Sequence, residues 1–120
     1  MEILRLHIDI KKTFELRSGD KAVRMVLFGG FCTSGCFEGK ILDGAVDTQI
    51  DTLLSARYML EGIDCAGKPC RLFIENNSAR NSAETKPVIF TDSDALKWLE
   101  AAELRGEIIH GDSLEISIHS

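Results

Sequence analysis

The chain has 120 residues, a mass of 13.3 kDa and a formal net charge of −5. A chain of this length forms one hydrophobic core, which excludes mechanisms that depend on movement between domains. The excess of 19 acidic over 14 basic residues argues against a surface that neutralises nucleic-acid phosphates or anionic lipid. We therefore expect a single globular domain over residues 1–120, with no nucleic acid and no membrane as partner.

The start of the chain shows no export signal, because Met1 leads directly into an alternating segment over residues 2–10. We therefore expect a cytoplasmic protein with reduced thiols. The cysteines form two pairs with three and four intervening residues, whereas zinc sites typically use two-residue spacers. The prediction is no metal site at Cys32, Cys36, Cys65 and Cys70.

The first elements in chain order are two strands. Leu4, Leu6, Ile8 and Ile10 alternate with polar residues, which is the pattern of a strand with one buried face. The alternation extends to residue 16 and ends at the turn-forming residues 17–20. A second strand over residues 23–27 leads into Gly29-Gly30.

Five of the ten glycines fall within residues 29–44. Their spacing matches neither G-x-G-x-x-G nor G-x-x-x-x-G-K-S/T, and no helix follows to hold a phosphate at its N-terminus. Glycines also allow strands to bend, to bulge or to pass close to another backbone. We interpret this stretch as barrel corners and not as a nucleotide site.

Alternation continues through residues 45–51, 56–61, 71–75, 88–90 and 114–118, which are further predicted strands. Residues 76–85 are polar and are predicted to be a loop. Capping residues at 91–94 predict a helix from Asp92. Periodicity allows it to continue to Leu104, and the alternative is a strand that begins near Glu103 and runs to His110.

About eight short strands without long crossovers indicate an antiparallel sheet. Closing such a sheet into a barrel removes its exposed edges, and a barrel of about eight strands holds packed side chains or one small ligand. The prediction is a mainly β, single-domain antiparallel barrel with one short helix.

Polar residues in mid-strand are the candidate functional groups. Asp47 and Gln49 share one face of a strand, as do Arg57 and Glu61. Inside a barrel, burial would raise a carboxylate pKa and the guanidinium would lower it. The alternative, which the pattern alone favours, is a solvent-facing cross-strand ion pair of little energetic weight.

Several short motifs occur along almost the whole chain in the order typical of one known family. They are Gly29-Gly30, Ser34-Gly35, residues 39–47 (GKILDGAVD), Ala56-Arg57-Tyr58, Glu61, Gly67, residues 74–77 (IENN), residues 87–91 (PVIFT) and Trp98-Leu99. The chain thus resembles the uncharacterised domain-of-unknown-function family 3237, also called uncharacterised protein family 0311. Asp43 replaces a frequent proline of that family, and Thr48 replaces a tryptophan that would offer a large stacking surface.

The resemblance implies a lipocalin-like barrel with a central cavity, a helix near residues 92–101, and an inward position for Asp47, Arg57 and Glu61. These three are the catalytic candidates. The ligand-binding candidates are Asp47, Gln49, Arg57, Tyr58, Glu61, Asn76 and Trp98. Neither metal nor cofactor is predicted.

Three functions remain open. In a binding module, Arg57 would fix a carboxylate or enolate oxygen of a small, partly apolar ligand. In a cofactor-independent isomerase, cyclase or hydratase, Asp47 or Glu61 would move a proton and Arg57 would stabilise the oxyanion. In a structural or interaction protein, aromatic side chains would fill the barrel, namely Phe28, Phe31, Phe73 and Trp98. A homo-oligomer is also expected, since small barrels commonly associate through sheet faces.

Overall fold

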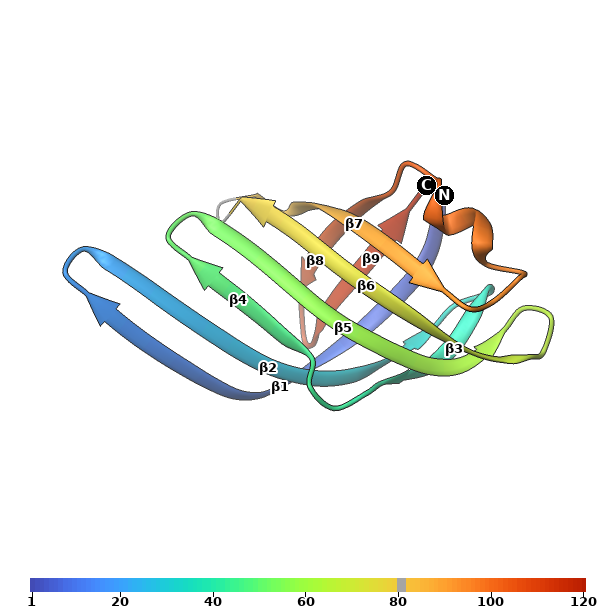
Figure 1. Cartoon of the computed structure of the whole chain (residues 1–120), viewed down its shortest axis with the longest axis horizontal. Helices are drawn as coiled ribbons and strands as arrows, with labels where there is room; N and C mark the ends of the chain where they lie inside the picture. Colours follow the sequence, from blue (N-terminus) through green and yellow to red (C-terminus); the bar gives the residue numbers. More distant parts are fainter. Residues whose placement is uncertain (80–81) are drawn as a thin grey trace.

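The computed structural model describes residues 1–79 and 82–120 and is built almost wholly from antiparallel strands (Figure 1). No helix in these ranges is both long and apolar enough to cross a membrane. The elements are β1 (Glu2–Ser18), β2 (Lys21–Thr33), β3 (Phe37–Ile41), β4 (Val46–Ile50), β5 (Leu53–Asp64), β6 (Pro69–Ala79), β7 (Glu84–Thr91), the 3-10 turn η1 (Lys97–Glu100), β8 (Arg105–His110) and β9 (Leu114–His119).

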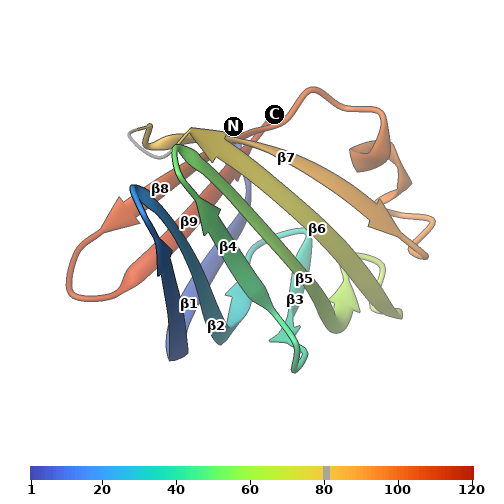
Figure 2. The same ribbon diagram turned by 60° about the vertical axis from the view of Figure 1, so that its left-hand side comes forward.

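The strands close into a ring, which confirms the predicted barrel of about eight strands (Figure 2). The ring runs β1-β9-β8-β7-β6-β5 and returns to β1 through β2. Strands β3 and β4 share the position between β5 and β2. β3 pairs with residues 31–33 of β2, and β4 pairs with residues 23–27.

Two glycines show why the stretch before β4 is rich in this residue. Gly30 has a φ of +136°, and a Cβ there would overlap the carbonyl oxygen of His7 on the neighbouring strand. Gly44 has a φ of +100° and lies where the chain breaks between β3 and β4. Both conformations are costly for a residue with a side chain. The expectation that glycines of this stretch allow close backbone approach is confirmed at Gly30.

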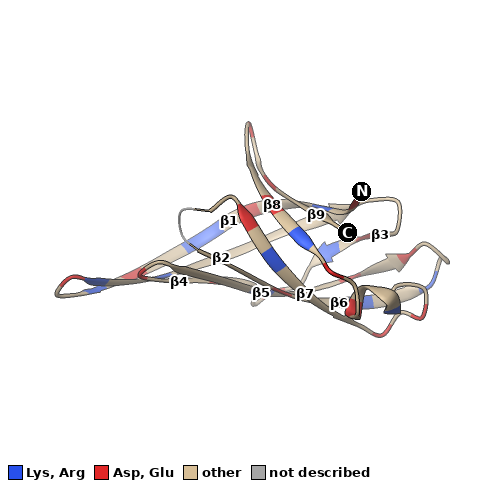
Figure 3. Cartoon of the chain, turned by 90° about the horizontal axis from the view of Figure 1, so that it is seen from above, with Lys and Arg blue, Asp and Glu red and all other residues tan. Residues whose placement is uncertain are grey.

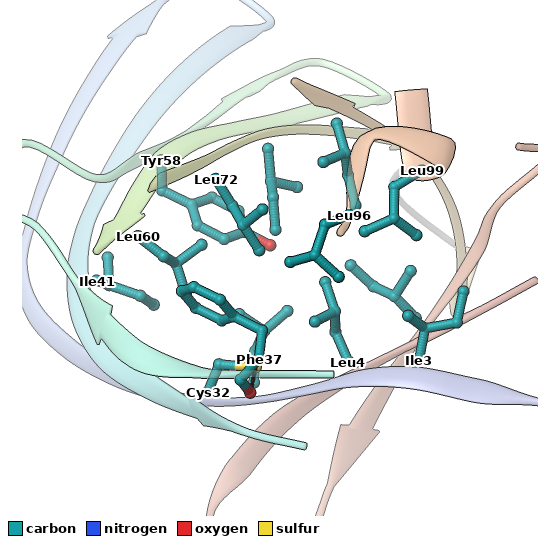
Figure 4. Close-up of a cluster of buried hydrophobic side chains, with 14 of the residues drawn as sticks. Ile3, Leu4, Cys32, Phe37, Ile41, Tyr58, Leu60, Leu72, Leu96 and Leu99 are labelled. Atoms are coloured by element: carbon teal, nitrogen blue, oxygen red, sulfur yellow. Dashed lines mark hydrogen bonds between the residues drawn. The ribbon is translucent and has the colours of Figure 1, made fainter. Parts of the chain in front are cut away.

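The hydrophobic core (Figure 4) fills the half of the barrel near the chain termini, which are marked in Figure 1. Leu4 of β1, Phe37 of β3 and Leu72 of β6 point into this half and are almost fully buried. Leu96 and Leu99 cover the same end from the segment before β8 and are at most 1% exposed. One end of the barrel is therefore sealed by side chains.

The predicted helix near residues 92–101 is wrong in extent, because only Lys97–Glu100 forms a 3-10 turn. Ser93 Oγ caps the segment by accepting the Leu96 N–H at 3.2 Å and donates to Asp64 Oδ2 at 2.6 Å. Glu100 accepts the N–H of Thr91 at 3.0 Å. These bonds hold the segment across the barrel end. The alternative prediction, a strand from near Glu103 to His110, is confirmed, because β8 runs from Arg105 to His110.

The predicted loop at residues 76–85 is also wrong, because β6 extends to Ala79 and β7 begins at Glu84. Asn76 and Asn77 pair with Pro87 and Lys86 across the two strands. Their polar side chains suggested a loop, but tertiary pairing overrides this local preference. Residues 82 and 83 lie outside the strands, and positions 80 and 81 lie outside the described residues.

Strands β1 and β2 extend well past the barrel as a hairpin arm, which gives the molecule a long axis of 51 Å against 27 and 26 Å (Figure 1). The register shifts between Ile10 and Lys12, so that a β-bulge at Lys11 separates the barrel part of β1 from the arm. The β4–β5 hairpin lies beside this arm and pairs with β2.

Candidate functional site

The barrel is open at the end opposite the sealed core. An inner cavity of about 100 Å³ leads to an outer cleft of about 590 Å³. The two spaces share six lining residues and therefore form one continuous opening. The shared residues are Ile10, Val26, Asp47, Leu54, Ile108 and Leu114.

Two residues that line the inner cavity each have a buried side-chain oxygen without a hydrogen-bond partner among the described residues. The oxygens are Asn76 Oδ1 and Thr85 Oγ1, and each of the two residues is 5% exposed. Most other side chains of the cavity are apolar, including Ile8, Phe28 and Ile116. An unsatisfied buried polar group costs about 1–3 kcal/mol. A polar group of a bound molecule would remove that cost.

Thr85 and Asn76 lie beside the weakest seam of the ring. Strands β7 and β8 pair at two positions among the described residues, one of which is Thr85 opposite Gly106. A Cβ on Gly106 would overlap Thr85 Oγ1, so the glycine makes room for this hydroxyl. A hollow of about 630 Å³ adjoins the seam and shares Leu54, Ser78 and Thr85 with the inner cavity.

The mouth of the cavity is polar. Gln49 Nε2 donates to Asp47 Oδ2 at 2.9 Å, and both residues line the outer cleft. Arg24 also lines the cleft, and its Nε lies 3.8 Å from Glu15 Oε2. Asp47 is the one charged side chain among the described residues that line the inner cavity. The site thus has polar groups at its mouth and mostly apolar side chains inside.

Tyr58 faces the barrel interior beside this cavity. Its ring meets Phe28 edge-on at 5.3 Å between centroids, and the residue is 3% exposed. Its hydroxyl has no hydrogen-bond partner among the described residues. Burial raises the pKa of Tyr58 above its ordinary value, so the phenol is neutral at physiological pH.

The expected inward position of Arg57 and Glu61 is wrong. The Arg57 side chain is 67% exposed and its Nε lies 2.9 Å from Glu75 Oε2. The Glu61 side chain is 45% exposed and lies 2.8 Å from Arg71. Asp47 faces the cavity and pairs with Ala56, so strand alternation turns the adjacent Arg57 outward. The alternation of polar and apolar residues alone had favoured solvent-facing ion pairs, and Arg57 and Glu61 form such pairs. Their partners, Glu75 and Arg71, are not the ones expected.

In the structural alternative four aromatic residues were expected to fill the barrel, and three of them do not point into it. Phe28 faces inward, but Phe31 is 45% exposed and stacks on His7 at 4.5 Å. Phe73 stacks on Phe90 at 6.2 Å, and the latter is 56% exposed. Trp98, a ligand-binding candidate, is 50% exposed on η1, at the sealed end. Aliphatic residues seal that end instead.

The four cysteines are free thiols, and burial raises the pKa values of Cys32, Cys36 and Cys70. Burial therefore disfavours the thiolate form of Cys32, Cys36 and Cys70. Over residues 1–79 and 82–120, no group of three His, Cys, Asp or Glu side chains is placed to hold a metal ion.

Comparisons with known proteins reveal the fold alone. No family model and no curated protein matches the chain. A protein of unknown function from Clostridium acetobutylicum is similar in structure, with a TM-score of 0.80, 21% identity and coverage of 98% of this chain and 95% of that one. A β-barrel-like protein from Acinetobacter baumannii has a TM-score of 0.74 and 16% identity over 98% of this chain and 91% of that one. An enzyme from Penicillium herquei has a TM-score of 0.66 and 16% identity over 99% and 92% of the two chains.

Proposed function

We propose that the open end of the barrel binds a small, mostly apolar molecule whose polar group bonds to Asn76 and Thr85. The observation that carries this proposal is the pair of buried, unpartnered oxygens on two residues that line a mostly apolar cavity. Small-molecule sites typically combine apolar walls with a few convergent polar groups. The outer cleft of about 590 Å³ lies within the range of about 300–1,000 Å³ that such sites occupy.

The unpartnered atoms define the chemistry of the ligand. Asn76 Oδ1 is an acceptor, so it needs a hydroxyl or N–H donor, whereas the Thr85 hydroxyl can donate or accept. The apolar wall contributes about 25 cal/mol for each Å² of ligand surface that it removes from water. The ligand class is therefore a small alcohol, phenol or amide on an apolar body, held at the mouth by Asp47 and Gln49.

A matched pair of probes tests this ligand class. 2-Naphthol carries a hydroxyl donor, and 2-methoxynaphthalene has the same ring system without the donor. We expect 2-naphthol to raise the melting temperature more than 2-methoxynaphthalene does. Equal shifts from the two probes would contradict a role for the buried oxygens.

Two adjacent substitutions locate the binding. Ala56 lines the inner cavity, so Ala56→Leu fills space there and should abolish the shift that 2-naphthol causes. Arg57 is the next residue and faces solvent, so Arg57→Ala should leave the shift unchanged. A shift that survives Ala56→Leu would place binding outside this cavity.

A second candidate function rests on Asp47, whose carboxylate lies where the apolar cavity meets the polar mouth. It could accept a proton from one atom of a bound molecule and return it to another, which is an isomerisation without cofactor. Turnover that disappears in Asp47→Asn while binding persists would favour this enzyme over a binding protein.

Membership of the family that the sequence resembles stays a prediction, as does a cytoplasmic location.

A further inference from the structure

The hairpin arm has an apolar outer face that spans four strands. Cross-strand pairing places Leu16, Val23, Ile50 and Leu53 in one row. A second row consists of Phe14, Met25, Thr48 and Ser55. We call these eight residues the outer arm face. Five of its large apolar side chains are exposed, from 42% for Met25 to 66% for Leu16.

The opposite face of the arm is polar. It lines a shallow groove with Glu15, Arg17, Asp20, Ala22, Arg24, Gln49 and Asp51. In the barrel wall the apolar side chains point inward onto the core, whereas in the arm they point away from the chain's own interior. Contiguous exposed apolar patches of a few hundred Å² typically mark interaction sites. This chain therefore leaves uncovered a face that has the composition of an interface core.

We propose that the outer arm face packs against the same face of a second copy, forming a two-fold symmetric dimer. Four strands at about 4.8 Å spacing and three rows at about 6.7 Å give a flat area of roughly 400 Å². This is about half of the roughly 800 Å² that each partner of a standard interface buries, so the dimer belongs to the small, weak class of interfaces. The centre of an interface has few charged residues and its rim is polar. The uncharged rows supply that centre, and flat sheet faces pack well at about 10 Å separation.

The charges at the rim suit a second copy. The third row runs from Lys12 through Leu27, Val46 and Arg57 to Glu75. Lys12 stands at one end, and at the other end Glu75 lies 2.9 Å from Arg57 Nε and has a second carboxylate oxygen for another cation. A two-fold axis along the strands lays the β1 side of one copy over the β6 side of the other. Lys12 then faces Glu75 of the partner subunit, and the symmetric contact repeats this pair. Acidic and basic residues at the tip of the arm extend the rim (Figure 3).

Sedimentation velocity over about 1–100 μM protein tests the dimer. The wild type should sediment as a dimer at the upper concentrations. Leu53→Lys places a charge at the centre of the interface and should weaken dimerisation by at least about tenfold. Phe90→Lys is the control, because Phe90 is 56% exposed but lies on β7, beyond the charged row.

The rim pair gives a second, independent test. Lys12→Glu should weaken the dimer, and addition of Glu75→Lys should restore it. A monomeric wild type, or a dimer that withstands Leu53→Lys, would overturn the proposal. Failure of the double variant to recover would overturn the two-fold arrangement. Circular dichroism of each variant verifies its fold, and unchanged 2-naphthol binding separates this surface from the cavity.

Discussion

Thr85 and Thr91 form a natural pair for testing the unpartnered oxygens, because both lie on β7 and are buried, at 5% and 8% exposure. Thr85 Oγ1 has no partner among the described residues. Thr91 Oγ1 donates to the Arg71 carbonyl at 2.8 Å and accepts the Ser93 N–H at 3.0 Å. Valine has almost the shape of threonine, so the same substitution at both sites isolates the hydroxyl.

The two substitutions should change stability in opposite directions. An unsatisfied buried hydroxyl costs about 1–3 kcal/mol, so we expect Thr85→Val to raise the free energy of unfolding by about 1 kcal/mol. Thr91→Val removes two hydrogen bonds worth about 1 kcal/mol each and should lower it by about 2 kcal/mol. The corresponding melting-temperature changes are about +4 °C and about −8 °C for a domain of this size.

Urea unfolding of ligand-free protein measures both changes, and a thermal-shift titration with 2-naphthol measures binding by the same variants. Thr85→Val should weaken that binding by about fivefold, the value of one hydrogen bond of about 1 kcal/mol. Greater stability together with weaker binding is typical of a group kept for function at a cost in stability. Destabilisation by Thr85→Val would refute the reasoning, because it would mean that the hydroxyl already has a partner.

The remaining predictions concern the sealed end and the outer surface. Hydrogen bonds from Ser93 and from the N–H groups of Lys68 and Ala66 lower the pKa of Asp64 below its ordinary value of 3.8. The ionised Asp64 therefore stabilises the folded state above pH 3.8, and this stabilisation is lost as the pH falls through the lowered pKa. In urea titrations, the difference in unfolding free energy between wild type and Asp64→Asn should shrink as the pH becomes acidic. Arg57→Ala and Glu61→Gln should each change the free energy of unfolding by less than about 0.5 kcal/mol in urea, because their ion pairs are exposed. Leu96→Ala should lower it by about 2–5 kcal/mol in the same assay, because it opens a cavity in the core.

The barrel could be predicted because alternation of apolar and polar residues is a local property of each strand. The run from Leu4 to Ile10 shows one buried face without any tertiary information. The segment before β8 could not be predicted as a 3-10 turn, because Asp64 and Thr91, which hold Ser93 and Glu100, come from other strands. Capping signals predicted the start of the segment but not its conformation.

Alternation gives two faces to a strand, but it does not say which face points inward when both carry polar groups. Asp47 and Arg57 illustrate this limit, since the register of β4 and β5 turns one inward and the other outward. Asn76 was a ligand-binding candidate, whereas Thr85 was missed, and both residues had been assigned to the predicted loop. The signal for Thr85 was the alternation of Thr85, Pro87 and Ile89, which are all buried in the structure.

Native mass spectrometry of the freshly purified protein tests the central proposal, that the open barrel end holds a small molecule, most directly. We predict that wild type carries an additional small-molecule mass, that Arg57→Ala retains it and that Ala56→Leu lacks it. An additional mass that persists undiminished in Ala56→Leu, or a wild type that neither carries such a mass nor binds 2-naphthol, would contradict the account.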